Sequence, residues 1–427
     1  MKHTLKLAAV LLALGFNISC SRSPGFKSQI LFETVAPDTI PYRIPAMALL
    51  DDGSLLALAD YRYCKLDIGF GRVDIHSRVS RDEGRSWSKE SVVISGTGVP
   101  GAVDCGFGDP AVVADSESGE ILLMMVCGET VYWHATTNRR NPNRVAVLRS
   151  SDNGRTWSAW EEATESVYSL FDASVHGCVE SCFVASGKIF QSRCIKVGSH
   201  YRIYAALCAR PNGNRVIYSD DFGHTWSALG GPDCLPATGG DEPKCEELPD
   251  GRVVLSSRAY GGRIFNIYTY TDIKTGEGCW DDASFSGFEN NGCTALENTC
   301  NGEVLILPVV RRADGEEVFV AFQSVPLGPG RSNVGIYYKE IVPSDVAGLT
   351  SADLAAGWQP AYQVSALSSA YSTMIQQRNG HIAFFYEEAY NESTRGFDLV
   401  YKEIPVEVIT AGAYESRLTP AGGSPSL

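Results

Sequence analysis

The sequence lacks the patterns that would assign it to several large classes of protein. After the first 20 residues, no apolar run approaches the roughly 20 residues that a membrane-spanning helix needs. There is no HExxH motif, no pair of CxxC motifs and no glycine-rich loop of the nucleotide-binding type. The seven histidines show no spacing typical of metal ligands. We therefore expect no metal, no cofactor and no membrane-spanning segment in the main part of the chain.

Basic residues are also scarce, at 36 Lys and Arg against 50 Asp and Glu, which gives a formal net charge of -14. Such a chain is unsuited to nucleic acid as a partner, and an anionic ligand would need a locally positive pocket. Long amphipathic helical patterns and Pro- or Ser-rich linkers are absent. The composition therefore favours one acidic domain built mainly of strands.

The N-terminal segment has the layout of a secretory signal. Lys2 and Lys6 precede an apolar run over 7–16, and Cys20 follows soon after. A cysteine directly after a small residue resembles a bacterial lipoprotein processing site. We expect residues 1–20 to form a signal peptide, Cys20 to be the first mature residue with a lipid anchor, and the protein to be exported to the periplasm or cell surface. The alternative is ordinary signal cleavage nearby and a freely secreted product.

Cysteine is abundant, with 13 residues in all. Setting Cys20 aside leaves 12, an even number that suits an oxidising compartment. The sequence does not reveal any pairing, so we expect either structural disulfides or buried thiols.

One motif of eight residues, Ser-x-Asp-x-Gly-x-x-Trp, occurs three times, at 80–87, 150–157 and 219–226. We call it the Asp box. The copies begin 70 and 69 positions apart, and recurrence at a fixed long period is typical of repeat proteins. The Asp predicts a turn in which its side chain bonds the backbone two residues on, and the Gly supplies a positive φ. We expect each Asp box to connect two strands.

The rest of the chain also favours strands. The segments before the Asp boxes, 73–78, 144–149 and 214–218, alternate or are rich in β-branched residues. A second hairpin signal with Gly recurs at 51–53, 118–119, 249–251, 301–302 and 379–380. Weaker echoes of the Asp box occur at 272–280 and 353–358, and the small, polar residues after Ile409 are expected to fray.

Dividing the 407 residues from 21 to 427 by the spacing of about 70 gives six units, a known propeller size. The sequence therefore predicts an all-β fold, a six-bladed β-propeller of four-stranded antiparallel blades, as a single domain over 21–427.

The segment Tyr42-Arg43-Ile44-Pro45 stands before the first strand pair, and the three Asp boxes follow it. Further along come a glutamate before a second arginine, a third arginine, and a tyrosine followed by a Tyr-Glu pair. In this order the chain resembles the exo-α-sialidase (neuraminidase) family, over nearly all of residues 21–427. The resemblance implies an enzyme that removes terminal sialic acid from glycoconjugates.

A sialic acid carries a carboxylate on the carbon whose bond is broken, and arginine binds carboxylates with a planar, permanently charged fork. The resemblance assigns this role to Arg43, Arg258 and Arg331, with Glu387 as the acid that steadies Arg43. Clustered arginines repel one another by a few kcal/mol a pair at a dielectric near 20, so acids or ligand must compensate them. For the third position Arg311 and Arg312 remain alternatives on the same stretch of chain.

Most glycosidases attack with a carboxylate, which would here meet the substrate's own carboxylate. The family instead uses a tyrosine whose proton passes to a glutamate. The resemblance places the nucleophile at Tyr371 and the activating acid at Glu242. Glu246 and Glu247 lie close in sequence and remain competitors for Glu242, and Tyr371 has the alternative of packing between strands.

The general acid of the family lies on a loop after the first hairpin. Asp67 is our assignment, and Arg62 on the same loop is expected to add a contact to the substrate carboxylate. Asp109 matches an aspartate near the substrate's ring substituents, with the alternative that it only forms a turn before Pro110. Asp74 is expected to be structural.

The sequence thus predicts an exo-α-sialidase that acts with retention on sialylated glycans. Two alternatives stay open. One is a propeller lectin that binds such glycans without cleaving them. The other is an enzyme that transfers sialic acid or acts on a related ulosonic acid.

Overall fold

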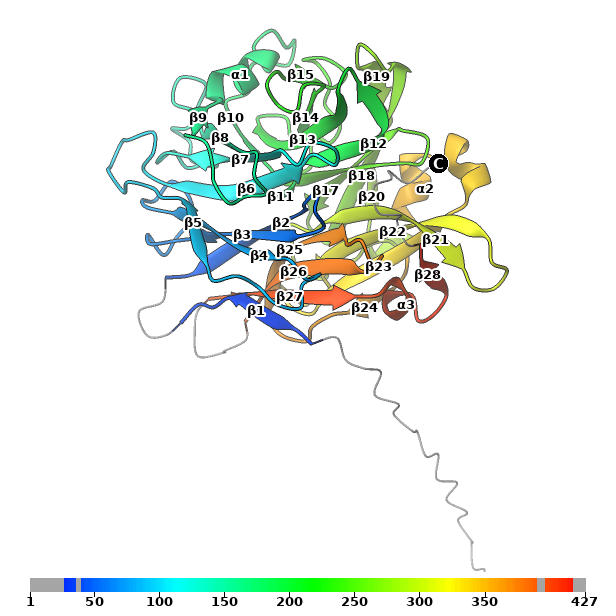
Figure 1. Cartoon of the computed structure of the whole chain (residues 1–427). Helices are drawn as coiled ribbons and strands as arrows, with labels where there is room; N and C mark the ends of the chain where they lie inside the picture. The colour runs from blue at the N-terminus through cyan, green and yellow to red at the C-terminus, as the bar shows by residue number, and fades with distance from the viewer. Residues whose placement is uncertain (1–26, 36–39, 390–395, 418–427) are drawn as a thin grey trace, which may run out of the picture.

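The computed structural model describes residues 27–35, 40–389 and 396–417. The predicted signal peptide and Cys20 lie outside them. The described strands form six sheets that surround a common axis as the blades of a propeller (Figure 1). The predicted fold is therefore confirmed, with short extra strands added to several blades.

Each blade takes most of its strands from consecutive chain. The first has β2 (Tyr42–Leu49), β3 (Leu55–Tyr61), β4 (Asp74–Ser80) and β5 (Ser91–Ile94). The second has β6 (Phe107–Ala114), β7 (Ile121–Cys127), β8 (Arg144–Ser150) and β9 (Glu161–Glu162), and β11 (Gly187–Lys188) pairs parallel with β6. The third has β10 (Ser181–Val184), β12 (Phe190–Val197), β13 (His200–Arg210), β14 (Arg215–Ser219) and β15 (Ser227–Ala228).

The remaining blades follow the same plan. The fourth has β16 (Pro243–Glu247), β17 (Val253–Ala259), β18 (Gly262–Asp272), β19 (Glu277–Trp280) and the short β20 (Ser284–Ser286). The fifth has β21 (Val304–Arg311), β22 (Glu317–Pro326), β23 (Val334–Ile341), β24 (Gln359–Gln363) and β28 (Tyr414–Ser416). The sixth has β25 (Ser369–Gln376), β26 (Ile382–Glu388), β27 (Asp398–Ile404) and β1 (Gln29–Phe32).

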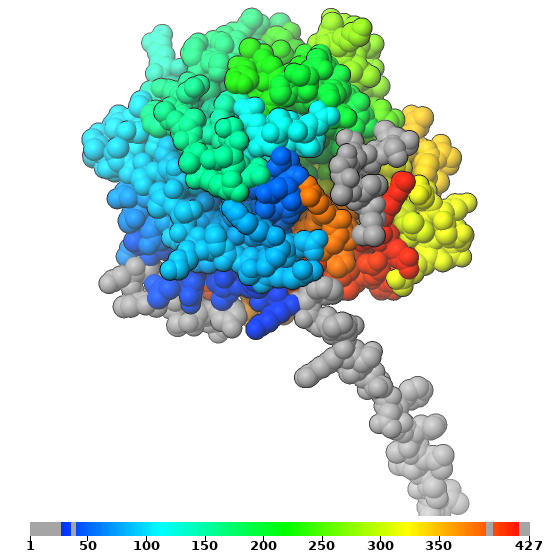
Figure 2. All heavy atoms as spheres, viewed as in Figure 1, coloured from blue at the N-terminus to red at the C-terminus, as the bar shows by residue number. Residues whose placement is uncertain are grey.

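The N-terminal strand closes the ring. β1 pairs antiparallel with β27, so the first strand of the chain is the outer strand of the last blade (Figure 1). The first strand of the first blade, β2, lies against β25 of the last blade. In the space-filling view, segments coloured blue and orange therefore lie side by side (Figure 2).

The three Asp boxes connect the third strand of a blade to its outer strand, as expected. In the first copy, Ser80 Oγ donates to Asp82 Oδ1 at 2.9 Å and accepts the N–H of Gly84 at 2.8 Å. Asp82 Oδ1 accepts the N–H of Ser86 at 2.8 Å, four residues on and not two as predicted. The other copies repeat these bonds.

Three further turn predictions had different outcomes. The echoes at 272–280 and 353–358 do lie between the third and fourth strands of their blades, the second of them within α2 (Ser351–Ala355) and the turn after it. The signal at 301–302 was wrong as a hairpin, because it leads into β21, and the β21–β22 turn lies at 312–315 instead. The expected fraying after Ile409 was wrong for residues 414–416, because β28 pairs with β21, and residues 418–427 lie outside the described ranges.

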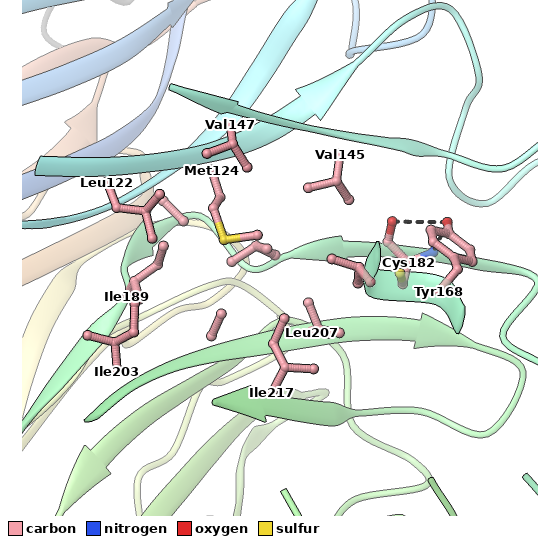
Figure 3. Packing of buried hydrophobic residues seen from close by; sticks show 14 of the residues in the cluster. Leu122, Met124, Val145, Val147, Tyr168, Cys182, Ile189, Ile203, Leu207 and Ile217 are labelled. Carbon is pink, nitrogen blue, oxygen red and sulfur yellow. Dashed lines mark hydrogen bonds between the residues drawn. The ribbon is translucent and has the colours of Figure 1, made fainter. Parts of the chain in front are cut away.

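The core lies between neighbouring blades. Figure 3 shows Leu122 and Met124 of β7 and Ile203 and Leu207 of β13 pointing into the layer between the second and third blades. Alternate residues of a strand face the same side, which explains the spacing of two in the first pair and of four in the second. Burying each such side chain contributes about 1.5 to 3 kcal/mol.

Short helices lie outside the sheets: α1 (Thr164–Tyr168), α2, α3 (Val406–Ile409), η1 (Ser169–Phe171), η2 (Phe288–Asn290) and η3 (Pro343–Gly348). Within the described ranges, no helix has the length and apolar character needed to cross a membrane. The twelve cysteines of those ranges are free thiols. Seven of them are buried, as the second of the two expected alternatives has it, while four are half-buried and Cys279 is exposed.

Candidate active site

The residues of the candidate site lie at the same end of their blades because of the directions of the two strands in each hairpin. The start of the first strand and the end of the second strand of an antiparallel hairpin meet at the same edge. Arg43 opens β2 and pairs in register with Asp60 at the end of β3. In the same way Glu242 stands just before β16, next to Arg258 at the end of β17. Tyr371, near the start of β25, follows the same rule.

Tyr371, Glu242 and Arg258 form one hydrogen-bonded group. The phenol of Tyr371 donates to Glu242 Oε1 at 2.8 Å, and Arg258 Nη1 donates to the phenol oxygen at 3.0 Å and to Glu242 Oε2 at 2.6 Å. Burial and the neighbouring carboxylate of Glu242 raise the pKa of Tyr371 well above its usual value, while Arg258 acts in the opposite direction. A phenol held this way loses its proton only to a base in direct contact, and Glu242 is in that position.

Arg43 is held by Glu387 of β26. Arg43 Nε donates to Glu387 Oε1 at 2.7 Å and Nη2 donates to Oε2 at 3.2 Å. Burial disfavours the charge of Arg43, but Glu387 outweighs it and the pKa of the guanidinium is raised. The next residue, Ile44, has a φ of 61° in an irregular part of β2, and its N–H donates to Glu387 Oε1 at 2.8 Å. This conformation is rare for a β-branched residue, and the bond to Glu387 accompanies it.

Arg331 completes a group of three arginines around Tyr371. The guanidinium carbons of Arg331 and Arg43 lie 5.6 and 5.8 Å from the centre of the Tyr371 ring. Arg258 Nε donates to Thr299 Oγ1 at 2.9 Å, and Arg331 Nη2 donates to the carbonyl of the same threonine at 3.5 Å. Three cations therefore converge above one phenol.

The two alternatives for the third arginine lie elsewhere. Arg311 pairs with Asp314, Glu316 and Glu340, and Arg312 pairs with Glu415. Neither lines the cavity that contains Tyr371.

Asp67 lies on the loop after β3, with 53% of its side chain exposed. Its carboxylate is 3.0 Å from Arg62 Nη1. Arg62 is itself buried, with Nη2 2.9 Å from Asp60 and 3.8 Å from Asp109. Arg62 thus bonds carboxylates of the protein, and its predicted contact with a substrate carboxylate stays a prediction.

Two of these acids, Asp60 and Asp109, have raised pKa values. Burial raises the pKa of Asp60 to about 6 although Arg62 opposes the shift. Burial, with the charges of Asp60 and Asp67, raises the pKa of Asp109 well above its usual value. Asp109 also has a φ of 54° before Pro110, and its N–H donates to Asp60 Oδ1 at 3.0 Å. Asp109 therefore lines the site as well as forming a turn.

The remaining acids are placed away from the phenol. Glu246 pairs with Lys188 and Arg193, and Glu247 accepts from Ser192, so neither competitor of Glu242 lines the cavity. Asp74 pairs with Arg72.

The cavity around these residues has a volume of about 320 Å³. Its charged wall is formed by the residues described above, and its apolar wall by Val131, Tyr132, Trp133 and Phe183. Within the described ranges, no three His, Cys, Asp or Glu side chains are grouped to hold a metal ion. The cavity suits a small anionic ligand that also carries apolar or neutral groups.

Sequence reasoning missed three residues here. Asp60 lies beneath Arg62, Thr299 bonds Arg258, and Asp241 Oδ2 lies 3.3 Å from Arg258 Nε. Asp241 directly precedes Glu242, so its place next to the predicted base was a usable signal. Thr299 comes from a loop without regular structure, and nothing in its sequence marks it.

Comparisons with known proteins show which family the chain belongs to. Residues 69–384 match the family described as BNR repeat-like domain. The chain is 28% identical over 376 residues to a sialidase of Micromonospora viridifaciens, covering 84% of this chain and 52% of that protein. It is 28% identical over 290 residues to a sialidase of Paraclostridium sordellii, covering 62% of this chain and 68% of that one. The chain thus spans about half the length of the first of these relatives.

Solved structures share the fold. The Hadza microbial sialidase Hz136 superposes with a TM-score of 0.69 at 19% identity, covering 90% of this chain and 69% of that one. A leech intramolecular trans-sialidase superposes with a TM-score of 0.67 at 16% identity, covering 90% and 71%. With the family match over most of the chain, these relatives confirm the resemblance seen in the motifs: the chain belongs to the BNR repeat-like domain family and is related to the sialidases.

Proposed function

We propose that the protein is a retaining exo-α-sialidase that hydrolyses terminal sialic acid from glycans, with Tyr371 as nucleophile. The observation that carries the proposal is the 2.8 Å hydrogen bond from Tyr371 to Glu242, surrounded by three arginines. A phenol bonded to a base is an unusual nucleophile, and it is favoured where the reacting carbon bears a carboxylate, because a neutral attacker avoids repulsion.

Substrate binding follows from charge. Arg43, Arg258 and Arg331 would hold the substrate carboxylate, whose negative charge relieves the repulsion among them. Glu387 and Glu242 balance part of that charge in the protein without ligand. The partners this site would take are sialylated glycoproteins, glycolipids or oligosaccharides.

The first step would form a bond between Tyr371 Oη and the anomeric carbon. The phenolic proton passes to Glu242 Oε1, the bond to the leaving oxygen breaks, and that oxygen takes a proton from Asp67. In the second step Asp67 accepts a proton from water, the water oxygen attacks the anomeric carbon, and Tyr371 leaves and regains its proton from Glu242. Two displacements at one carbon retain its configuration.

The exposure of Asp67 supports this double role. It lies on a loop at the mouth of the cavity, where leaving group and water arrive, whereas Asp60 is fully buried and Asp109 is 14% exposed. Arg62 restrains the Asp67 carboxylate at 3.0 Å without enclosing it.

The decisive experiment is hydrolysis of a fluorogenic aryl sialoside followed by NMR of the first-formed sugar. The α anomer first is expected, and the β anomer first would contradict a double displacement. An internal anhydro sugar, or transfer to an added acceptor, would assign the protein to the transferring alternative. Binding of sialylated glycans without any cleavage would assign it to the lectin alternative. Export and lipid attachment at Cys20 remain proposals, tested by mass measurement of the mature N-terminus.

A further inference from the structure

A second layer of polar side chains lies directly beneath the candidate site. Alternate residues of a strand face the same side, so Lys244 lies one step below Glu242 on β16, and Thr373 one step below Tyr371 on β25. Glu303, just before β21, connects the two. Its Oε2 accepts from Thr373 Oγ1 at 3.0 Å and lies 4.0 Å from Lys244 Nζ.

The backbone of Gly187 in β11 lies next to all three of these groups. A Cβ added to Gly187 would contact Lys244 Nζ, Thr373 Oγ1 and Glu303 Oε2. Gly187 also has a φ of 110°, a backbone conformation that favours glycine.

Lys244 is buried without a hydrogen bond of its own. Its side chain is 1% exposed, and Nζ has no hydrogen-bond partner among the described residues. Burial lowers the pKa of Lys244, while Glu303 and Glu242 act in the opposite direction. A buried ammonium with so few contacts is costly, and such groups are rare unless a nearby charge compensates them.

The layer holds more positive charge than Glu303 balances. Arg263 is also fully buried, and it donates to Ser256 Oγ and to the carbonyls of Ser256 and Cys300, with no ion pair in the described ranges. Lys188 lies 3.7 Å from Glu303, but it also bonds Glu246 at 3.2 Å. The carboxylate of Glu242, directly above, compensates part of this excess positive charge.

We propose that Lys244 is a positioning residue for the reaction: a fixed buried cation beneath Glu242 that keeps this carboxylate ionised and ready to accept the proton of Tyr371. The inference rests on the proposed function. Lys244 does not line the cavity, so it acts through Glu242 and not on the substrate.

The other groups around Glu242 explain why a cation below it matters. Arg258 bonds Glu242 directly, and the positive charges of Lys244 and Arg263 also act on this carboxylate. Asp109 and Asp241 lie on the same side of the site and would favour the protonated form, as a like charge does. The phenol of Tyr371 and the thiols of Cys208 and Cys300 complete the titratable groups facing it. Loss of Lys244 removes one of the positive charges that act on Glu242, and we therefore expect protonation of Glu242 to become more favourable.

The test is the pH profile of kcat/KM on an aryl sialoside for the wild type and three variants. Lys244→Met is expected to move the acidic limb upward by about one pH unit, with kcat lowered and KM nearly unchanged. Glu303→Gln removes a negative charge next to Lys244, so the acidic limb of this variant should move to lower pH. Lys188→Met removes one positive charge at the side of the layer next to Glu246. The acidic limb of this variant should move by less than a third of the shift expected for Lys244→Met.

If Lys244→Met fails to fold, the double variant K244M/E303Q removes both charges together and is expected to fold with a smaller upward shift. An active wild type with an unmoved limb in the Lys244 variants would overturn the inference and leave the proposed function intact. An inactive wild type would overturn the proposed function. The same variants would then be compared by the pH dependence of binding of an unsaturated sialic acid analogue, where a difference supports the role of Lys244 and identical profiles overturn it.

Discussion

The carboxylate of Glu387 joins the side chain of Arg43 to the last blade of the propeller. Its Oε1 accepts from Arg43 Nε at 2.7 Å, and its Oε2 also accepts the backbone N–H of Tyr371 at 3.1 Å. One fully buried acid therefore sets the position of Arg43 and of the strand that carries Tyr371, the proposed nucleophile. This dual contact makes Glu387 the most sensitive structural residue of the site.

Replacing Glu387 by Gln should lower the free energy of unfolding by about 3 kcal/mol, because it leaves the Arg43 charge without its counterion in a buried setting. Denaturant unfolding measures this directly. The matched control is Glu317→Gln, since Glu317 pairs with Arg417 at 3.1 Å on the surface with 61% of its side chain exposed, and should cost less than about 1 kcal/mol. Equal losses in the two variants would contradict the prediction.

Replacing Tyr371 by Phe removes only the phenolic oxygen. Turnover of an aryl sialoside should fall by orders of magnitude because no attacking oxygen remains, while circular dichroism shows a folded protein. Tyr386→Phe serves as control, because that phenol bonds Glu388 within the same blade and does not line the cavity. Activity of the Tyr371 variant within a few-fold of wild type would remove Tyr371 from its role.

Replacing Arg258 by Leu should weaken binding of a sialic acid transition-state analogue by about 2 to 5 kcal/mol, since a buried, charge-paired hydrogen bond donor is lost. Calorimetric titration gives the value. Arg312→Leu removes the same charge from an exposed pair with Glu415 and should leave affinity unchanged. Unchanged affinity in the Arg258 variant would refute the assignment.

Replacing Gly84 by Ala in the first Asp box should cost about 2 to 4 kcal/mol. Gly84 has a φ of 82°, and a Cβ there would collide with the hydroxyl of Tyr401. Gly101 has a φ of 78° with no atom within 4 Å of its Cβ position, so Gly101→Ala shows the backbone strain alone, about 1 kcal/mol. Thermal unfolding measures both variants. Equal decreases in Tm for Gly84→Ala and Gly101→Ala would mean that the new Cβ at position 84 avoids Tyr401.

The pair of His381 and Glu403 should make stability depend on pH. Nδ1 lies 2.6 Å from the carboxylate, which raises the pKa of His381 above 6.5 and lowers that of Glu403 below 4.5. The histidine part of the stabilisation is complete below pH 6.5 and is lost as the pH rises through its raised pKa. The glutamate part is complete above pH 4.5 and is lost as the pH falls through its lowered pKa.

The difference in unfolding free energy between wild type and His381→Gln should therefore be largest near pH 5.5, at up to about 1 kcal/mol, and smaller at pH 8.5. Urea unfolding at both values is the measurement. A difference that grows toward pH 8.5 would show that the sign is wrong.

The fold was predictable because its turns are local. The Ser, Asp and Gly of each Asp box form hydrogen bonds within the same eight residues, so the turn can be recognised without knowledge of tertiary contacts. The signal at 301–302 failed because an Asn-Gly pair also suits a loop that enters a strand, and only pairing with a partner strand separates the two cases.

Choices between neighbouring residues could not be made in advance. Glu242 directly precedes β16 and Glu246 lies within it, so the two are close in sequence, yet Glu242 bonds Tyr371 and Glu246 pairs with Lys188 and Arg193. Likewise Arg311 and Arg331 stand at opposite ends of their blade, which sequence position does not reveal. The order of residues along the chain identifies the candidate site residues, and the geometry of the blades determines which of them lie in contact.

Because β1 completes the last blade, the two ends of the chain must come together before the ring exists. The contact between Arg43 and Glu387 bridges that junction between first and last blades, 344 residues apart in sequence. A chain still being synthesised has no such junction. The proposed activity would therefore require a molecule whose ring is already closed, so measuring it would also report complete folding.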